Sequence, residues 1–127
     1  MLRRALRHRG TAGLVDAAQE VLTLLAQDGI YMEDLAVQPA DPVLWRALAA
    51  STDGAAALES VRDRSSLALT AGRMGDDAVF RAAVERFLQR FEAAFRDFAG
   101  RADDAEVQLF AETRTARAYL LCARAAR

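Results

Sequence analysis

Side chains that commonly carry out chemistry are sparse in this chain. It contains one histidine, His8, and all seventeen of its basic residues are arginine. The absence of lysine excludes Schiff-base chemistry and a lysine general base. His8 stands in the arginine-rich stretch MLRRALRHRG without a fixed nucleophile or orienting group, so we interpret it as a solvated residue. We therefore predict no catalytic residue and no cofactor.

Three short patterns suggest metal or phosphate sites, but each has a simpler structural interpretation. The pairs Asp76-Asp77 and Asp103-Asp104 stand where helices are expected to begin, and a carboxylate there accepts free backbone N–H groups. No histidine or further acid lies at ligand spacing, so we predict no metal site. The stretch GRMG at 72–75 lacks the strand, lysine and Ser/Thr of a phosphate-binding loop, which favours a helix–helix turn.

Arg114 is the most informative polar residue. It projects from the middle of one face of a predicted helix over residues 103–125, a face otherwise formed by Val107, Phe110, Ala111, Ala118, Leu121 and Ala125. A guanidinium held there can bind an anionic group, and Arg117 and Thr113 would assist it. The alternative is an arginine whose stem covers apolar surface while its head reaches solvent or an internal acid.

The same predicted helix is apolar on a second side, which includes Leu109 and Leu120. A helix that is apolar nearly all round either lies centrally or covers a partner. These two leucines are therefore candidates for partner binding. The lone Cys122 lies on this helix among small and apolar residues, which indicates a buried thiol without a disulfide.

The elements that must position these residues are helical. Two proline and seven glycine residues leave little room for a turn-rich β architecture, and alanine, the best helix former, is the commonest residue. We predict an all-α fold: an up-and-down bundle of four long helices over about 12–28, 55–72, 76–99 and 103–125, with one or two short helices over about 31–36 and 42–50.

Five of the six phenylalanines fall within nineteen residues of the predicted helix 76–99. They are spaced by three, four or seven residues, at positions 80, 87, 91, 95 and 98. This spacing gathers them on one side of a helix. An aromatic ligand pocket or an exposed docking ridge would have the same pattern, but the short flanking links favour a central core helix.

Charge is unevenly distributed along the chain. Residues 1–10 carry four arginines, Arg3, Arg4, Arg7 and Arg9, and no acid, whereas the formal net charge of the whole chain is −1. We predict a basic, flexible N-terminal arm over 1–10 and a single helical domain over 11–127. The nearly neutral domain makes nucleic acid an unfavoured partner, although the arm could contact it weakly.

Compartment and source are inferred from composition. No apolar run is long enough to span a membrane, and the apolar stretch after the basic start is interrupted by Asp16 and Glu20, unlike a secretory signal. The single cysteine agrees with a reducing cytoplasm. Abundant arginine together with alanine is typical of a GC-rich bacterial genome, the alternative being selection of arginine for anion binding.

These observations predict a small bacterial cytoplasmic interaction protein without catalytic activity, whose partner is another protein or a second copy. The alternative is a bundle that binds an anion or small ligand, or an unrecognised enzyme, with its site around Arg114.

Overall fold

The computed structural model describes residues 9–50 and 55–127. Its helices are α2 (Arg9–Gln27), a 3-10 turn η1 (Met32–Asp34), α3 (Pro42–Ala49), α4 (Ala55–Leu58), α5 (Arg64–Asp76), α6 (Ala78–Ala99), α7 (Asp104–Ala111) and α8 (Arg114–Ala125). The all-α class is therefore confirmed. Arg3, Arg4 and Arg7 of the predicted arm lie outside the described residues, and α2 begins slightly earlier than predicted.

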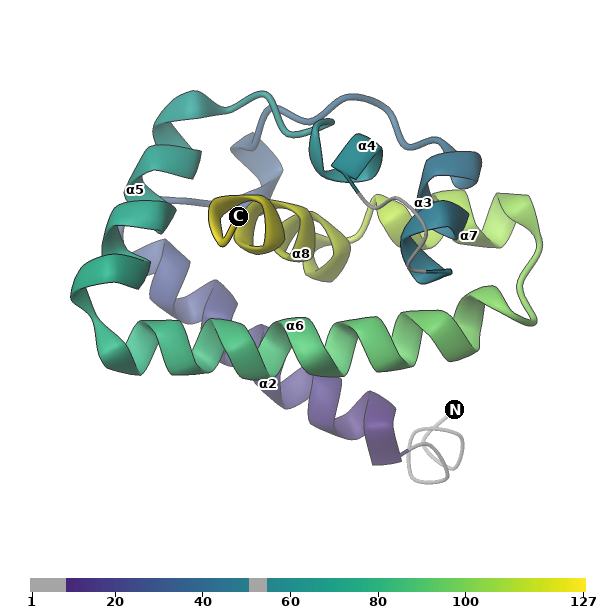
Figure 1. The fold of residues 1–127 in the computed structure, drawn as a ribbon, viewed down its shortest axis with the longest axis horizontal. Helices are drawn as coiled ribbons and strands as arrows, with labels where there is room; N and C mark the ends of the chain where they lie inside the picture. Colours follow the sequence, from purple (N-terminus) through teal and green to yellow (C-terminus); the bar gives the residue numbers. More distant parts are fainter. Residues whose placement is uncertain (1–8, 51–54) are drawn as a thin grey trace.

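The phenylalanine helix is α6, the longest element. Phe80, Phe87 and Phe91 have no exposed surface and Phe95 is 2% exposed, so the stripe belongs to the core. Figure 1 shows α2 crossing behind α6 and α8 running alongside α6, and the three helices contact one another. Burying each of these rings contributes roughly 1.5–3 kcal/mol.

The last helix, α8, lies at the centre of the structure. In Figure 1 it is surrounded by α5, α4, α7 and α6, and it also contacts α2 and η1. Six consecutive residues from Ala118 to Ala123 are buried. A helix enclosed in this way must be apolar on nearly all sides. This enclosure explains the second apolar side of the predicted helix, from which we predicted a partner.

Two of the predicted long helices are divided. The predicted helix 55–72 is α4 and α5, separated by an extended segment in which Val61 forms an isolated antiparallel bridge with Val37. Asp63 then begins α5, because its carboxylate accepts a hydrogen bond from Ser66 N at 3.1 Å. In α5, Leu69 is 54% exposed, whereas Thr70 faces the core and is buried.

The predicted helix 103–125 is likewise two helices, α7 and α8. The break falls at Thr113, whose hydroxyl accepts a hydrogen bond from Ala116 N at 3.2 Å and donates one to Phe110 O at 2.7 Å. The GRMG stretch is also not a turn, since residues 72–75 belong to α5 and Asp77 alone links α5 to α6.

Other helix boundaries follow from the local chemistry of capping residues. Asp41 and Asp77 cap α3 and α6, and Asp103 forms a reciprocal capping box with Glu106 at the start of α7. Gly29 ends α2 with φ +76°, while Ile30 N bonds back to Leu25 O at 3.0 Å. That pair of features forms a Schellman motif, which needs a left-handed residue at this position.

Arginine side chains connect the helices through backbone carbonyl groups. Arg46 donates to Ala99 O and Ala102 O, each at 2.8 Å, and so joins α3 to the end of α6. Arg73 donates to Leu24 O at 2.8 Å and lies over the Phe80 ring, 4.7 Å from its centroid. Such contacts satisfy carbonyls that a helix end leaves without partners.

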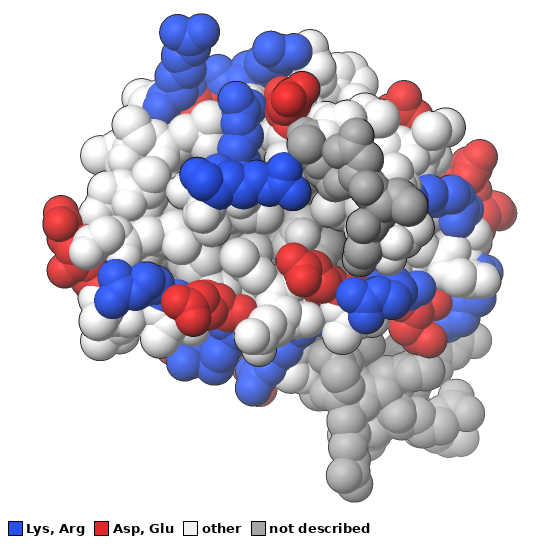
Figure 2. Space-filling view, viewed as in Figure 1, with Lys and Arg blue, Asp and Glu red and all other residues white. Residues whose placement is uncertain are grey.

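The described surface mixes the two charge signs. Figure 2 shows basic and acidic side chains interspersed across one face rather than gathered into a continuous basic area. No helix in the described part of the chain has the length and apolar content needed to cross a membrane.

Candidate functional site

The three residues predicted to bind a ligand lie at the start of α8, where each already has a structural contact. Thr113 is the N-cap, and Arg117 donates to Met32 O at 3.3 Å and Leu35 O at 3.4 Å. Arg114 is not in the middle of a buried face: its side chain is 66% exposed and pairs with Glu33 at 3.8 Å. Because the predicted helix is divided, Arg114 lies in the first turn of α8, at the surface.

The two predicted partner-binding leucines have opposite environments. Leu120 is only 2% exposed because neighbouring helices of the same chain cover α8, so its assignment to a partner surface is wrong. Leu109 on α7 is 69% exposed and remains available to a partner.

The groups that most often provide chemistry have ordinary structural roles. Cys122 has no exposed surface, and burial raises the pKa of its thiol to about 12, far from the range of a reactive cysteine. Within the described residues, no group of three or more His, Cys, Asp and Glu side chains is arranged to hold a metal ion.

A better candidate is a pocket of about 220 Å³ between α3, α6 and the end of α8. Its apolar wall consists of Leu48 and Ala49 from α3 and of Phe91 and Phe95 from α6. Its polar residues are Glu92, Arg96, Tyr119 and Arg127. We refer to it below as the Tyr119 pocket.

Aromatic packing fixes the wall of the Tyr119 pocket. The Tyr119 ring stacks on Phe91 with the ring centroids 4.1 Å apart and the planes 12° from parallel. Trp45 lies behind this wall, with its ring centroid 5.3 Å from that of Phe95. Such contacts hold the rings in place without a ligand, so the pocket is preformed.

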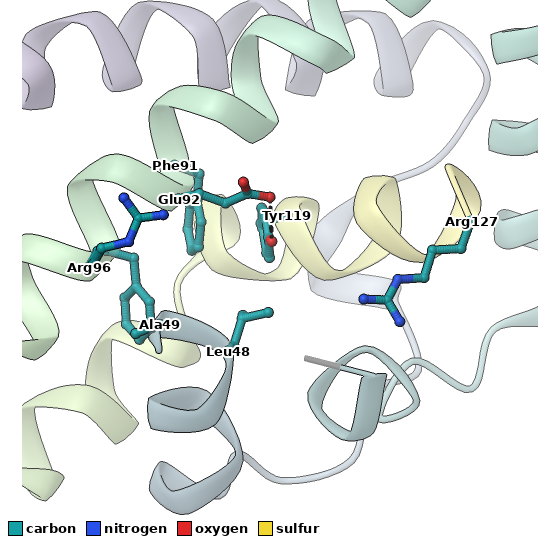
Figure 3. Close-up of a pocket in the computed structure, with 8 residues that line it drawn as sticks. Leu48, Ala49, Phe91, Glu92, Arg96, Tyr119 and Arg127 are labelled. Atoms are coloured by element: carbon teal, nitrogen blue, oxygen red, sulfur yellow. Dashed lines mark hydrogen bonds between the residues drawn. The ribbon is translucent and has the colours of Figure 1, made fainter. Parts of the chain in front are cut away.

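One hydrogen bond organises the polar side of the pocket. The Tyr119 hydroxyl, on a side chain that is almost wholly buried, donates to Glu92 Oε2 at 2.9 Å, and Figure 3 shows Glu92 reaching across to it. Burial, followed by this hydrogen bond and the Glu92 charge, raises the pKa of Tyr119 above its usual value. The hydroxyl therefore stays protonated as a hydrogen-bond donor rather than acting as a base.

Two arginines flank that hydrogen bond. In Figure 3, Arg96 lies on one side of the Glu92–Tyr119 pair and Arg127 on the other. Neither guanidinium forms an ion pair with a residue in the described ranges 9–50 and 55–127, although Arg96 is one helical turn from Glu92. Both side chains are exposed at the pocket, where they can reach a bound molecule.

Sequence reasoning missed this site for an identifiable reason. Phe91 and Phe95 belong to the apolar stripe of α6, and Glu92 and Arg96 lie on its polar side. The pocket lies on the boundary between these two faces, so the helical pattern does not indicate it. Tyr119 was the available signal, because a tyrosine among buried aliphatics requires a partner for its hydroxyl.

Comparisons with known proteins add no family. No family model matches the chain, and neither does any curated protein or any solved structure.

Proposed function

We propose that this protein is a non-enzymatic binding protein whose ligand site is the Tyr119 pocket. The observation that carries the proposal is the combination of a packed aromatic wall with four polar side chains that line one concave site. Concave sites of this composition are typical of small-molecule binding. A binding role also agrees with a buried Cys122 and a tyrosine kept in its protonated form.

The size of the pocket limits its ligand. Its volume of about 220 Å³ is below the 300–1,000 Å³ typical of drug-sized ligands. A cavity of about 150 Å³ suffices for benzene. The Tyr119 pocket therefore suits a molecule of about ten non-hydrogen atoms, for which we expect a dissociation constant on the order of 1 mM.

NMR titration tests this proposal directly. Uniformly ¹⁵N-labelled protein is titrated with 2-phenylethanol, and we expect shifts concentrated at Tyr119, Phe95 and the Trp45 indole N–H. Ala49→Leu fills the pocket from α3 and should abolish them. Ala82→Leu, at an exposed position of α6, is the matched control and should bind normally. Equal binding by both variants would refute the assignment.

A second candidate is the interaction role predicted from the sequence, with a second copy as the partner. It is supported by Val43 on α3 and Leu109 on α7, which are 71% and 69% exposed on two helices that contact each other. Sedimentation equilibrium at micromolar concentration tests it, with Leu109→Glu expected to shift a dimer to monomer. A wild-type protein that is strictly monomeric would reject this candidate.

A further inference from the structure

The charged side chains that line the Tyr119 pocket are two arginines and one glutamate. Arg96 and Arg127 carry positive charges, and Glu92 carries a negative charge. Glu92 directs one of its oxygens to the Tyr119 hydroxyl, and no ion pair joins it to Arg96 one turn away. Among the lining side chains, positive charge therefore exceeds negative charge by one beside an apolar wall.

From this arrangement we infer that the ligand is a small monoanion with an apolar body, such as an aryl-substituted carboxylic acid. This inference rests on the proposed binding function and specifies its ligand class. The apolar body would lie against the half-buried Leu48 and Ala49 of α3, and the carboxylate would face an arginine. A single negative charge balances the side-chain charges that line the pocket.

The behaviour of the other arginines strengthens the inference. Six arginine side chains in the described part of the chain donate to backbone carbonyls: Arg46, Arg73, Arg81, Arg90, Arg117 and Arg124. Their guanidinium groups are therefore occupied in holding the fold together. Arg96 and Arg127 make no such contact with residues 9–50 or 55–127, yet both line the pocket. A guanidinium that is free in the protein can donate its hydrogen bonds to a ligand carboxylate.

The wall itself argues for a compact apolar body. The Phe91, Phe95 and Tyr119 rings pack on one another and are almost fully covered, so they form the rigid backing of the pocket. The apolar surface that a ligand can reach is that of the half-buried Leu48 and Ala49. One six-membered ring with a short carboxylate arm fits a volume of about 220 Å³.

Three probes of nearly equal size isolate the effect of charge: phenylacetate, 2-phenylethanol and 2-phenylethylammonium. We expect phenylacetate to bind about fivefold more tightly than the alcohol, and the ammonium compound most weakly. The factor is modest because both guanidinium groups reach solvent, where an ion pair contributes at most about 1 kcal/mol. Raising the salt concentration should reduce the advantage of phenylacetate, because salt screens exposed charges.

Variants connect this preference to the two arginines. The double variant Arg96→Gln/Arg127→Gln should bind phenylacetate and 2-phenylethanol equally, while the single variants show which arginine faces the carboxylate. Arg64→Gln removes one exposed arginine outside the pocket and is the charge-matched control. It should retain the wild-type preference.

The outcomes separate the two proposals. If the alcohol binds as tightly as phenylacetate and Ala49→Leu abolishes both, the anion inference is overturned and the binding site stands. Tightest binding by the ammonium compound, or a preference that persists in the double arginine variant, also overturns the inference. If none of the three probes shifts the pocket resonances at about 10 mM, the proposed function itself fails.

Discussion

Alkaline pH should destabilise this protein through two identifiable groups. The chain has no lysine, so the side chains that titrate between the carboxylates and the arginines are His8, Cys122 and two tyrosines. Burial raises the pKa of Cys122 from 9.0 to about 12, and burial with the Glu92 hydrogen bond raises that of Tyr119 from 10.0. Above pH 9 the unfolded chain therefore binds fewer protons than the folded protein.

The sign and size of the effect follow from proton linkage. A group with a raised folded pKa contributes its full stability below its unfolded pKa and loses it as pH rises toward the folded pKa. The loss is about 1.4 kcal/mol per pH unit for each group. At pH 11, Cys122 has lost about 3 kcal/mol and Tyr119 about 1 kcal/mol. The sum is a large part of the 5–15 kcal/mol stability of a typical domain.

Urea unfolding monitored by Trp45 fluorescence at pH 8, 9, 10 and 11, under reducing conditions, measures this slope. Cys122→Ala should lower stability at every pH, because it removes packed atoms, but the steep decline between pH 9 and 11 should become shallow. Tyr119→Phe should remove the smaller decline above pH 10. Tyr31→Phe, at an exposed tyrosine, is the control. A Cys122→Ala variant with the wild-type slope would refute the assignment of the effect to the buried thiol.

Three further changes test the scaffold, each by urea unfolding. Phe91→Ala should lower the unfolding free energy by about 3–5 kcal/mol, because it removes a fully buried ring. A loss of under about 1 kcal/mol would contradict the core position of Phe91. Gly29→Ala should cost about 1 kcal/mol through its φ of +76° alone, since an added Cβ would have no described heavy atom within 4 Å apart from those of its chain neighbours. An unchanged stability would argue against this backbone conformation. Arg73→Lys should cost about 1–3 kcal/mol, because a single ammonium nitrogen cannot span Leu24 O, Gln27 and two carboxylates as the guanidinium fork does. Arg101→Lys, at an exposed pair, should be nearly neutral, and equal losses in the two variants would contradict the role of Arg73.

Structural features that depend only on residues close together in the sequence could be predicted from it. Asp41 before a proline and Asp103 three residues before Glu106 identify helix starts because the capping partners lie within one turn. The phenylalanine stripe identifies α6 because its period depends only on helix geometry. Gly29 marks the end of α2 for a similar local reason.

The two helix breaks depend on contacts between distant segments. Periodicity continues through residues 55–72 and 103–125, so it gives no sign of the extended segment at Val61 or of the new start at Thr113. Val61 is held by Val37 and by Arg124, which donates to Val61 O. These are long-range contacts that outweigh local helix propensity.

The candidate site could not be predicted because the break at Thr113 changes which residues each face of the last helix contacts. With α8 independent of α7, Arg114 moves to the surface beside Glu33, and Tyr119 meets Phe91 and Glu92 on α6. Of the apolar second side that suggested a partner, Leu120 is covered by the chain itself, whereas Leu109 on α7 stays exposed. Arg96 and Arg127 form no ion pair and no carbonyl contact with residues in the ranges 9–50 and 55–127, and both line one pocket. Their position at an apolar wall, in a structure where six other arginines bind carbonyls, is the strongest reason to look for a ligand there.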